Sequence, residues 1–355
     1  MRKTVALILP LVLVLSFSIA QAANRAKTSA ATAHLPSVAI AALQKVDGEH
    51  IRAHVRFLSH DLLEGRGTGQ RGGDIAAEYI ATQFWLYGLK AAGDNGSFFQ
   101  KVPMVGITPA PETTFAFVPA KGEAIDLKPL DQYVAYDQTQ QTSDDINAEV
   151  VFVGYGIEAP EYKWDDYKGV DVRGKVLLML VNEPSSDDPN FFKGRALTYY
   201  GRWTYKYEEA ARKGAVGAIL IHKSEMASYP WEVVRNSNSG EKSFLKSDAP
   251  QLKAAAWIQL EVARQLAQKS GMDIDKMISD AQSRDFHPEP LPVKLKAHMV
   301  SRVRPFSSQN VVAMLPGSDP NLNNEAVMYT AHYDHLGIRP DMPGDNIYNL
   351  SLIHI

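Results

Sequence analysis

Apolar residues recur at helical spacing in two segments near the start of the chain. The first segment places four apolar residues on one helical face: Ile51, Val55, Leu58 and Leu62. The second segment repeats this spacing at Ile75, Tyr79, Ile80 and Phe84. Asp74 is placed to cap the start of the second helix, and Gly88 is placed to end it. The stretch EGRGTGQRGG separates the two segments, so the pattern predicts two helices joined by a tight turn.

Short runs typical of strands dominate the middle of the chain. Residues 98–128 alternate apolar and polar positions between prolines, and AEVVFVGYGI and GKVLLMLVN are apolar, β-branched runs typical of buried strands. The stretch TYKYEEAARKGAVGAILIH predicts a helix, a break at Gly214 and another strand, whereas residues 259–281 predict helix. Because strands outnumber helices, we expect residues 131–300 to form an open β-barrel or an α+β module.

The N-terminus has the pattern of a secretory signal peptide. Arg2 and Lys3 precede an apolar run, and Ala20-Gln21-Ala22 is a small-x-small cleavage site. The run is short for a membrane span and Pro10 interrupts it, so we expect cleavage after Ala22 and a secreted or periplasmic protein without a stable membrane anchor.

Composition limits the chemistry that the chain can carry. Its 355 residues suggest about two domains, and a net charge of −3 implies neither nucleic acid nor an anionic membrane surface as a partner. No cysteine is present, which excludes disulfides, thiolate metal sites and a cysteine nucleophile. Any metal must therefore be held by histidine and carboxylate side chains.

The strongest candidate site follows a predicted strand, Ala326–Ala331, in the sequence AVMYTAHYDHLG. Ligands in α/β sheets gather beyond the carboxyl ends of strands, which is where His332 and Asp334 would lie. A neutral imidazole is a good zinc ligand, and an Asp two residues away could support it, since zinc-bound histidines donate their other N–H to a carboxylate or carbonyl. By spacing alone, a structural hydrogen bond between the two residues is the commoner arrangement. His335, three residues after His332, adds a little to the pattern.

Other motifs favour structural roles. The glycines in GTGQRGG satisfy G-x-G-x-x-G, but the dinucleotide-binding pattern needs a preceding strand, and here a helix is predicted instead. Ser59, His60 and Asp61 are adjacent and cannot face one another as a triad on a helix. The aromatic cluster at 191–207 could stack ligands, although such clusters are more often core. Three further histidines have no ligand-spaced neighbour and read as structural: His54, His222 and His298.

Several segments together resemble the M28 family of zinc aminopeptidases. LSHDLLEGRGTGQRGGDIAAEYIATQFWLYGLKAAG resembles the opening helices of the bacterial members, and QNVVAMLPGSDPNLNNEAVMYTAHYDHLGI resembles the strand pair that brings in their first zinc ligand. VFVGYGI, DVRGKVLLML and YEEAARKGAVGAILIH resemble the protease-associated (PA) domain that is inserted into many of these enzymes. The resemblance covers residues from about 50 to 349.

The resemblance implies an α/β fold: a zinc-peptidase-like, mostly parallel sheet with helices on both faces, incomplete in this chain, plus an inserted β-rich PA domain. It divides the chain into a signal peptide (1–22), the N-terminal part of the peptidase domain (23–130), the PA domain (131–300), the resumed peptidase domain (301–349) and a non-family tail (350–355). The tail, LSLIHI, does not match the family and is interpreted as translated read-through.

The resemblance also implies the chemistry: a two-zinc site that removes N-terminal residues from peptide or protein substrates. It maps His332 onto a zinc ligand and Asp334 onto the carboxylate that orients it. The family's bridging Asp, its Glu–Glu pair, a further Asp and a final His have no counterpart here, and Asp345 maps onto the loop ahead of the bridging Asp. We therefore expect this chain alone to be inactive. The alternative is a non-catalytic, PA-containing binding protein on a peptidase-like scaffold. The sequence leaves substrate preference and oligomeric state open.

Overall fold

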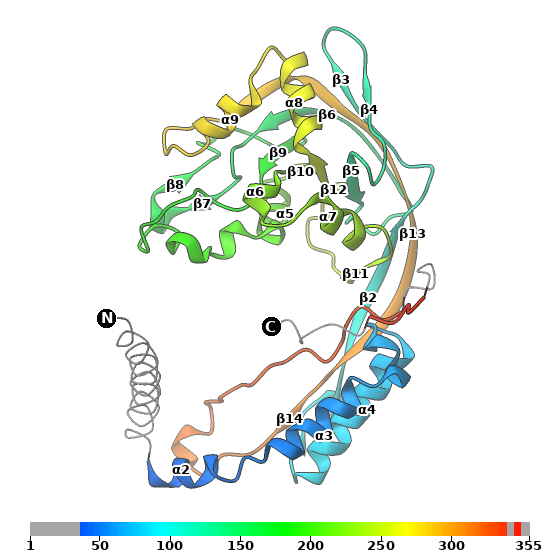
Figure 1. Ribbon diagram of the computed structural model, residues 1–355, viewed down its shortest axis with the longest axis vertical. Helices are drawn as coiled ribbons and strands as arrows, with labels where there is room; N and C mark the ends of the chain where they lie inside the picture. Colours follow the sequence, from blue (N-terminus) through cyan, green and yellow to red (C-terminus); the bar gives the residue numbers. More distant parts are fainter. Residues whose placement is uncertain (1–35, 339–343, 349–355) are drawn as a thin grey trace, which may run out of the picture. The chain divides into compact units, whose positions relative to one another are not determined.

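The protein has the predicted α/β class, with helices accompanying a mixed β-sheet (Figure 1). The computed structural model describes residues 36–338 and 344–348, so the predicted signal peptide and tail lie outside the described residues. The chain divides into two compact units. The first comprises the described parts of 1–76 and 332–355, and the second comprises 77–331. Within the described residues, no helix is both long and apolar enough to cross a membrane.

The first unit is built from short helices. They are α2 (Ser37–Leu43), α3 (Gly48–Leu58), the 3-10 helix η1 (Asp61–Arg66) and the first residues of α4 (Arg71–Leu86). Asp47 caps α3 by accepting a hydrogen bond from the Glu49 N–H at 2.8 Å. The predicted first helix therefore exists but ends at Leu58, before Leu62. None of the residues of α2 and α3 is buried.

The glycine-rich stretch joins η1 to α4, as predicted for a connection between two helices. A Cβ on Gly72 would lie 1.7 Å from the backbone oxygen of Leu63, so only glycine allows this close approach. Asp74 lies in the first turn of α4 and does not cap it, which corrects the prediction, because the helix begins earlier, at Arg71. Gly88 follows the end of α4 with φ of +73°, the left-handed conformation expected where a helix stops.

The second unit contains one large mixed sheet and two small pairs of strands. The large sheet has the order β11-β2-β13-β6-β9-β10-β12-β5, and β3 and β4 extend it beside β13. Its strands are β2 (Phe99–Pro109), β3 (Thr114–Pro119), β4 (Ile125–Asp126), β5 (Tyr133–Tyr136), β6 (Ser143–Phe152), β9 (Val176–Leu180), β10 (Gly217–His222), β11 (Lys242–Leu245), β12 (Ala254–Gln259) and β13 (Glu289–Val311). The small pairs are β1 (Lys90–Ala91) with β14 (Ala313–Met314), and β7 (Glu158–Ala159) with β8 (Trp164–Asp165).

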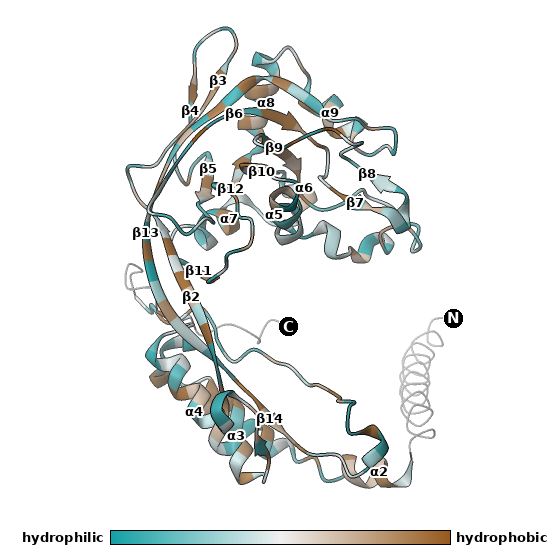
Figure 2. Ribbon diagram, turned by 180° about the vertical axis from the view of Figure 1, so that it is seen from behind, coloured by the Kyte–Doolittle hydropathy of each residue, from teal (hydrophilic) through white to brown (hydrophobic). Residues whose placement is uncertain are grey.

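Parallel strands form the centre of this unit, and helices cover both of their faces (Figure 2). The helices of the unit are α5 (Trp203–Arg212), α6 (Ser224–Ala227), α7 (Trp231–Ser237), α8 (Leu260–Lys269), α9 (Ile274–Asp280) and the 3-10 turns η2 (Asp94–Gly96), η3 (Pro160–Tyr162), η4 (Gly194–Ala196), η5 (Tyr199–Gly201) and η6 (Pro320–Leu322). Because side chains alternate along a strand, Leu178 and Ile219 face α8 and α9, whereas Leu177 and Leu220 face α5 and α7. The predicted helix, break at Gly214 and strand correspond to α5 and β10.

The large sheet curls so that the two edges of its strand order, β11–β2 and β5, come into contact without forming a ladder. Tyr136 of β5 packs with Val105 and Ile107 of β2, and with Phe244 of β11. The Tyr136 hydroxyl lies 2.8 Å from the backbone oxygen of Asn238 and 2.7 Å from that of Gly240, just before β11, and its single hydrogen is shared between these two acceptors. This is the arrangement of an open barrel. An open barrel or an α+β module was expected for residues 131–300, whereas the sheet found here also includes β2, which precedes that segment.

The 23-residue strand β13 serves two ladders. Its first half pairs with β6 and β3, and its second half pairs with β2 from Ser301 to Val311. It thus runs without a break through position 300, where the resemblance to PA-containing peptidases puts a domain boundary. The predicted boundaries of the peptidase and PA segments stay predictions.

The predicted strand at 326–331 is wrong. Residues Ala326–Ala331 have no regular structure, and Val327, Met328 and Tyr329 are 80–93% exposed. The segment has the composition of a buried strand, but a strand is stable only where a neighbour takes its backbone hydrogen bonds. None of the described residues pairs with this segment, so its composition alone does not produce a strand.

Candidate functional site

The candidate residues His332 and Asp334 lie in an irregular loop of the first unit. The Nδ1 atom of His332 is 2.8 Å from the backbone oxygen of Asp334. A carbonyl oxygen can only accept, so Nδ1 carries the hydrogen, and in the neutral ring the lone pair lies on Nε2. The His332 side chain is 63% exposed. The ring therefore presents a metal-binding nitrogen toward solvent, in the tautomer found when the second nitrogen is hydrogen-bonded to the protein.

The carboxylate of Asp334 is anchored by a residue far away in the sequence. Its Oδ2 atom accepts a hydrogen bond from the Thr68 hydroxyl at 2.6 Å, while its Oδ1 atom lies 3.5 Å from His332 Nδ1. The sequence predicted that the carboxylate of Asp334 would support His332. Here the shorter contact to the ring comes from the backbone oxygen of Asp334, and the carboxylate is bound by Thr68. The roles of His332 in metal binding and of Asp334 in orienting it stay predictions.

The glycine-rich turn holds the same loop through its backbone. His335 N–H donates to the Arg66 oxygen at 2.8 Å, and Gly337 N–H donates to the Gly65 oxygen at 3.1 Å. Arg66 adds its guanidinium, which donates from Nε to the backbone oxygen of Tyr333 at 2.7 Å and from its other arm to that of Leu58. Burial lowers the pKa of Arg66, whereas the nearby charge of Asp334 raises it. Sequence reasoning treated this turn as a connection only and missed its contact with the histidine loop.

The described residues do not by themselves fit a zinc site. Within 36–338 and 344–348, no three His, Asp or Glu side chains come together in a way that could hold a metal. A zinc ion bound by protein takes at least three protein ligands, and here His332 offers one.

The other motifs have structural roles in the described residues. The G-x-G-x-x-G stretch follows the 3-10 helix η1 and no strand, so it lacks the context of a nucleotide-binding turn. Ser59 follows the end of α3, and the Nδ1 atom of His60 accepts from the Leu62 N–H, so these residues cap helices. His222 contacts the backbone oxygen of Tyr229 at 3.1 Å. His298 contacts the Asp145 carboxylate at 2.8 Å, so its role is also structural.

The aromatic cluster at 191–207 is mainly packed against itself. Phe192 is fully buried and its ring lies 4.4 Å from that of Tyr162 and 5.9 Å from that of Tyr200. Tyr205 is also buried, whereas Tyr199 and Trp203 remain exposed. Most of the cluster is therefore core, the commoner of the two roles that its sequence allowed.

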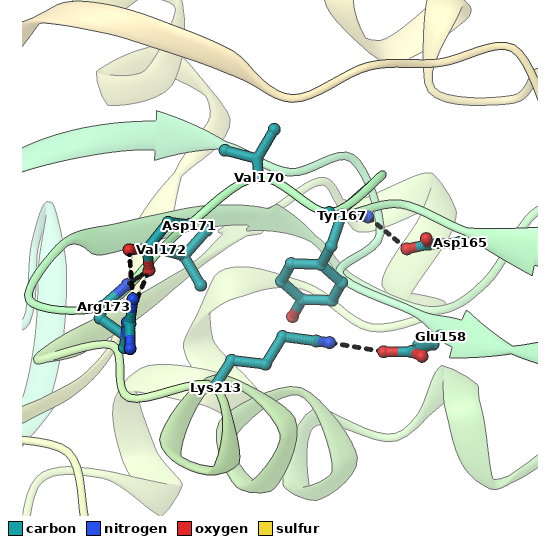
Figure 3. Close-up of a pocket in the computed structure, with 9 residues that line it drawn as sticks. Glu158, Asp165, Tyr167, Val170, Asp171, Val172, Arg173 and Lys213 are labelled. Carbon is teal, nitrogen blue, oxygen red and sulfur yellow. Dashed lines mark hydrogen bonds and ion pairs between the residues drawn. The ribbon is translucent and has the colours of Figure 1, made fainter.

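The second unit has a shallow pocket of about 300 Å³ (Figure 3). Lys213 extends across it, pairs with Glu158 and lies 4.4 Å from the ring centre of Tyr167. Arg173 pairs with Asp171 at 2.8 Å. Four of the charged side chains are thus paired with one another, and the fifth, Asp165, accepts from the Tyr167 N–H at 2.8 Å, so the pocket offers little to select a charged ligand.

A group of buried charges in the second unit escaped the sequence analysis. Lys206 is fully buried, and its Nζ atom has no hydrogen-bond partner among the described residues. Burial lowers its pKa to about 7, against the opposing effect of Asp166 and Glu183. Burial also raises the pKa of Asp166 to about 6. Nothing in the local sequence marks this lysine, since it lies in an amphipathic helix among other charged residues.

Comparisons with known proteins give a likeness to solved zinc aminopeptidases at low identity. No protein-family model matches the chain, and no curated protein matches it. Among solved structures, the aminopeptidase from Aneurinibacillus sp. strain AM-1 is 20% identical over 78% of this chain and 50% of its own, with a TM-score of 0.36. Two structures of BSAP, a zinc aminopeptidase from Bacillus subtilis, are 13% and 14% identical over 76% of this chain, with TM-scores of 0.28 and 0.27. The chain spans about half the length of these structures.

Proposed function

We propose that this protein is a secreted zinc-dependent metallopeptidase of the M28 type, which removes N-terminal residues from peptides. His332 supplies one zinc ligand, and Asp334 fixes the orientation of that ligand. The two-zinc site, the peptide substrate and export by the N-terminal signal sequence all belong to this proposal.

One observation of the structure carries the proposal. The Nδ1 atom of His332 is engaged by the backbone oxygen of Asp334, which leaves Nε2 as the ligating nitrogen on an exposed ring. An exposed histidine without such a contact would be free to adopt either tautomer. The order of the sequence motifs supports the family: the glycine-rich helical turn comes first, the PA-like segment second and the HYDHLG loop third.

A second candidate function is a PA-containing binding protein without catalysis. The observation that favours it is the donor set, since no group of three or more His, Asp or Glu side chains able to hold a metal occurs within the described residues. The two functions differ in zinc content and turnover.

The deciding experiment uses the product of the complete gene, purified without chelators. We expect stoichiometric zinc by elemental analysis after dialysis, and hydrolysis of leucine anilide. His332→Ala should abolish the hydrolysis and reduce the zinc content. Tight zinc binding requires several ligands fixed together, so the loss of one ligand weakens it. His50→Ala is the matched control, since this histidine of α3 has an 84% exposed side chain and pairs with Asp47 at 3.7 Å.

Three outcomes would contradict the proposal. A gene product that is folded, free of zinc and inactive would favour the binding protein. Full activity in His332→Ala would remove His332 from the site. Equal losses in His332→Ala and His50→Ala would show that histidine replacement harms the fold and does not report on a metal ligand.

A further inference from the structure

Two segments of the first unit, 266 residues apart, meet through a side-chain hydrogen bond between Thr68 and Asp334. The donor–acceptor distance is 2.6 Å, which is short and typical of a hydroxyl bound to a carboxylate. Thr68 lies between two glycines of the turn, where the backbone brings its hydroxyl to Asp334. Valine has nearly the same shape but no donor, so this contact can be removed with little change in volume.

Arg66 makes a second connection between the same segments. Its Nε atom donates to the backbone oxygen of Tyr333, the residue between His332 and Asp334, at 2.7 Å. Its other arm donates to the last residue of α3, Leu58. A guanidinium is a rigid, planar fork, so it can hold two acceptors at a fixed separation, which the single ammonium of a lysine cannot do as well.

The backbones of the two segments are close because glycines occur in both. Gly67 and His335 form a parallel bridge beside the two backbone hydrogen bonds described above. A Cβ on Gly65 would lie 2.6 Å from the Gly337 oxygen, and a Cβ on Gly337 would lie 2.4 Å from the amide oxygen of Gln70. Both glycines also have positive φ, of +64° and +75°. Any other residue at position 65 would clash with the Gly337 backbone and push the segments apart, whereas at position 337 the positive φ is what favours glycine, because the end of the Gln70 side chain could move.

We propose that the glycine-rich turn, Glu64–Gly73, is a positioning clamp for His332. Thr68 fixes the Asp334 side chain and Arg66 fixes the Tyr333 carbonyl, so the Asp334 backbone oxygen is held where it accepts from Nδ1 of His332. Thr68 and Arg66 are thus positioning residues, which act on the ring through Asp334 and Tyr333. The value of this orientation for a metal rests on the proposed function, but the clamp itself does not.

The test measures His332 directly in the 355-residue chain, labelled with ¹⁵N-histidine and freed of metal with a chelator. Ring nitrogen shifts report the tautomer, and couplings across χ1 report whether the side chain keeps one rotamer. In the parent we expect the Nδ1–H tautomer and a single rotamer. Thr68→Val should shift the tautomer ratio toward Nε2–H by roughly two- to tenfold, the effect of losing one hydrogen bond of ordinary strength, and should average the rotamers. Thr68→Ser keeps the hydroxyl and should restore the parental spectrum.

A matched control separates the clamp from a general effect of replacing threonine. Thr82 donates its hydroxyl within α4, to the Glu78 oxygen at 2.8 Å, so Thr82→Val should leave His332 unchanged. If Thr68→Val unfolds the first unit, Arg66→Lys provides the same test, with averaged His332 rotamers expected.

The proposal is overturned if both His332 readouts stay parental in a folded Thr68→Val or Arg66→Lys chain. It is also overturned if Thr82→Val has the same effect, or if Thr68→Ser fails to rescue. Because no zinc and no substrate are present, failure of the clamp and failure of the peptidase proposal are distinguished.

Discussion

The two units are stabilised by different interactions. In the second unit, β9 and β10 are buried along their whole length and helices cover both of their faces, so the removal of apolar surface from water holds the elements together. In the first unit, α2 and α3 have no buried residue, and the glycine-rich turn meets the His332 loop through hydrogen bonds and close backbone contacts. The second unit therefore depends most on buried apolar volume. The first unit depends most on glycines, whose lack of a side chain lets two backbones approach closely.

The units also differ in where they place charge. The second unit buries Lys206, Asp166 and Asp137 almost completely, and their pKa values are shifted by desolvation. In the first unit His332 and Asp334 remain partly exposed. Changes of pH near neutrality should therefore alter the stability of the second unit.

The largest expected effect tests the apolar core. Phe152 of β6 is fully buried, with its ring 5.6 Å from that of Phe286 in an edge-to-face contact. Phe152→Ala should destabilise the second unit by about 3–5 kcal/mol, since it removes buried surface and leaves a cavity. All five tryptophans lie in 77–331, so urea unfolding followed by tryptophan fluorescence reports this unit. Phe57 in α3 is 39% exposed, so Phe57→Ala should leave that transition unchanged. Equal effects would remove the contrast between the units.

An intermediate effect tests the close packing in the first unit. Gly72→Ala would place a Cβ 1.7 Å from the Leu63 oxygen, and we expect a local cost of about 3 kcal/mol, the upper range of overpacking. Hydrogen exchange of the His335 and Gly337 amides should then accelerate, because both donate to the turn. Gly48→Ala, where a Cβ would meet no atom within 4 Å, is the matched control. Unchanged exchange in Gly72→Ala would mean that the turn can shift without cost.

The smallest expected effect tests buried charge through pH. Asp137 is fully buried, accepts from the Thr139 hydroxyl at 2.6 Å and lies beside Asp144, which pairs with Lys253. Burial is the main reason that its pKa rises to about 6. The folded state therefore keeps a proton that the unfolded state loses near pH 4, so stability from this group is present below pH 4 and is lost as the pH rises through about 6.

Asp137→Asn mimics the protonated side chain at every pH. We expect it to match the parent near pH 4 and to be more stable by about 1–2 kcal/mol at pH 7. Urea unfolding at pH 4, 5, 6 and 7 measures the difference. A parent whose stability does not fall between pH 4 and 6 relative to the variant would contradict the assignment of a buried, protonated Asp137.

The sequence predicted individual helices and strands better than it predicted which segments pair with one another. The α/β class, the helix and strand around Gly214 and the turn between two helices all follow from local periodicity, which is a property of a few consecutive residues. The segment Ala326–Ala331 has the apolar composition of a buried strand but does not form one, because strand pairing depends on residues elsewhere in the chain. The misplaced cap at Asp74 is a smaller error of the same kind, since α4 begins three residues before it.

The residues around the candidate site show the same limit. His332 and Asp334 were singled out by the motif that contains them and by the resemblance to the M28 family, and their roles stay predictions. Thr68 and Arg66 were missed, because their contacts join residues more than 260 positions apart. The one signal that could have found them is the occurrence of glycines in both segments, at Gly65 and Gly337, where two backbones approach. Buried charges such as Lys206 had no signal at all.

The long strand β13 also has a consequence for how the chain matures. Its partner β2 is synthesised early, but the ladder from Ser301↔Pro109 to Val311↔Phe99 closes only when roughly two hundred further residues have been made. Until then β2 presents an unpaired edge that another chain could occupy. The order of synthesis therefore leaves β2 as one segment through which the newly made protein could associate with another chain.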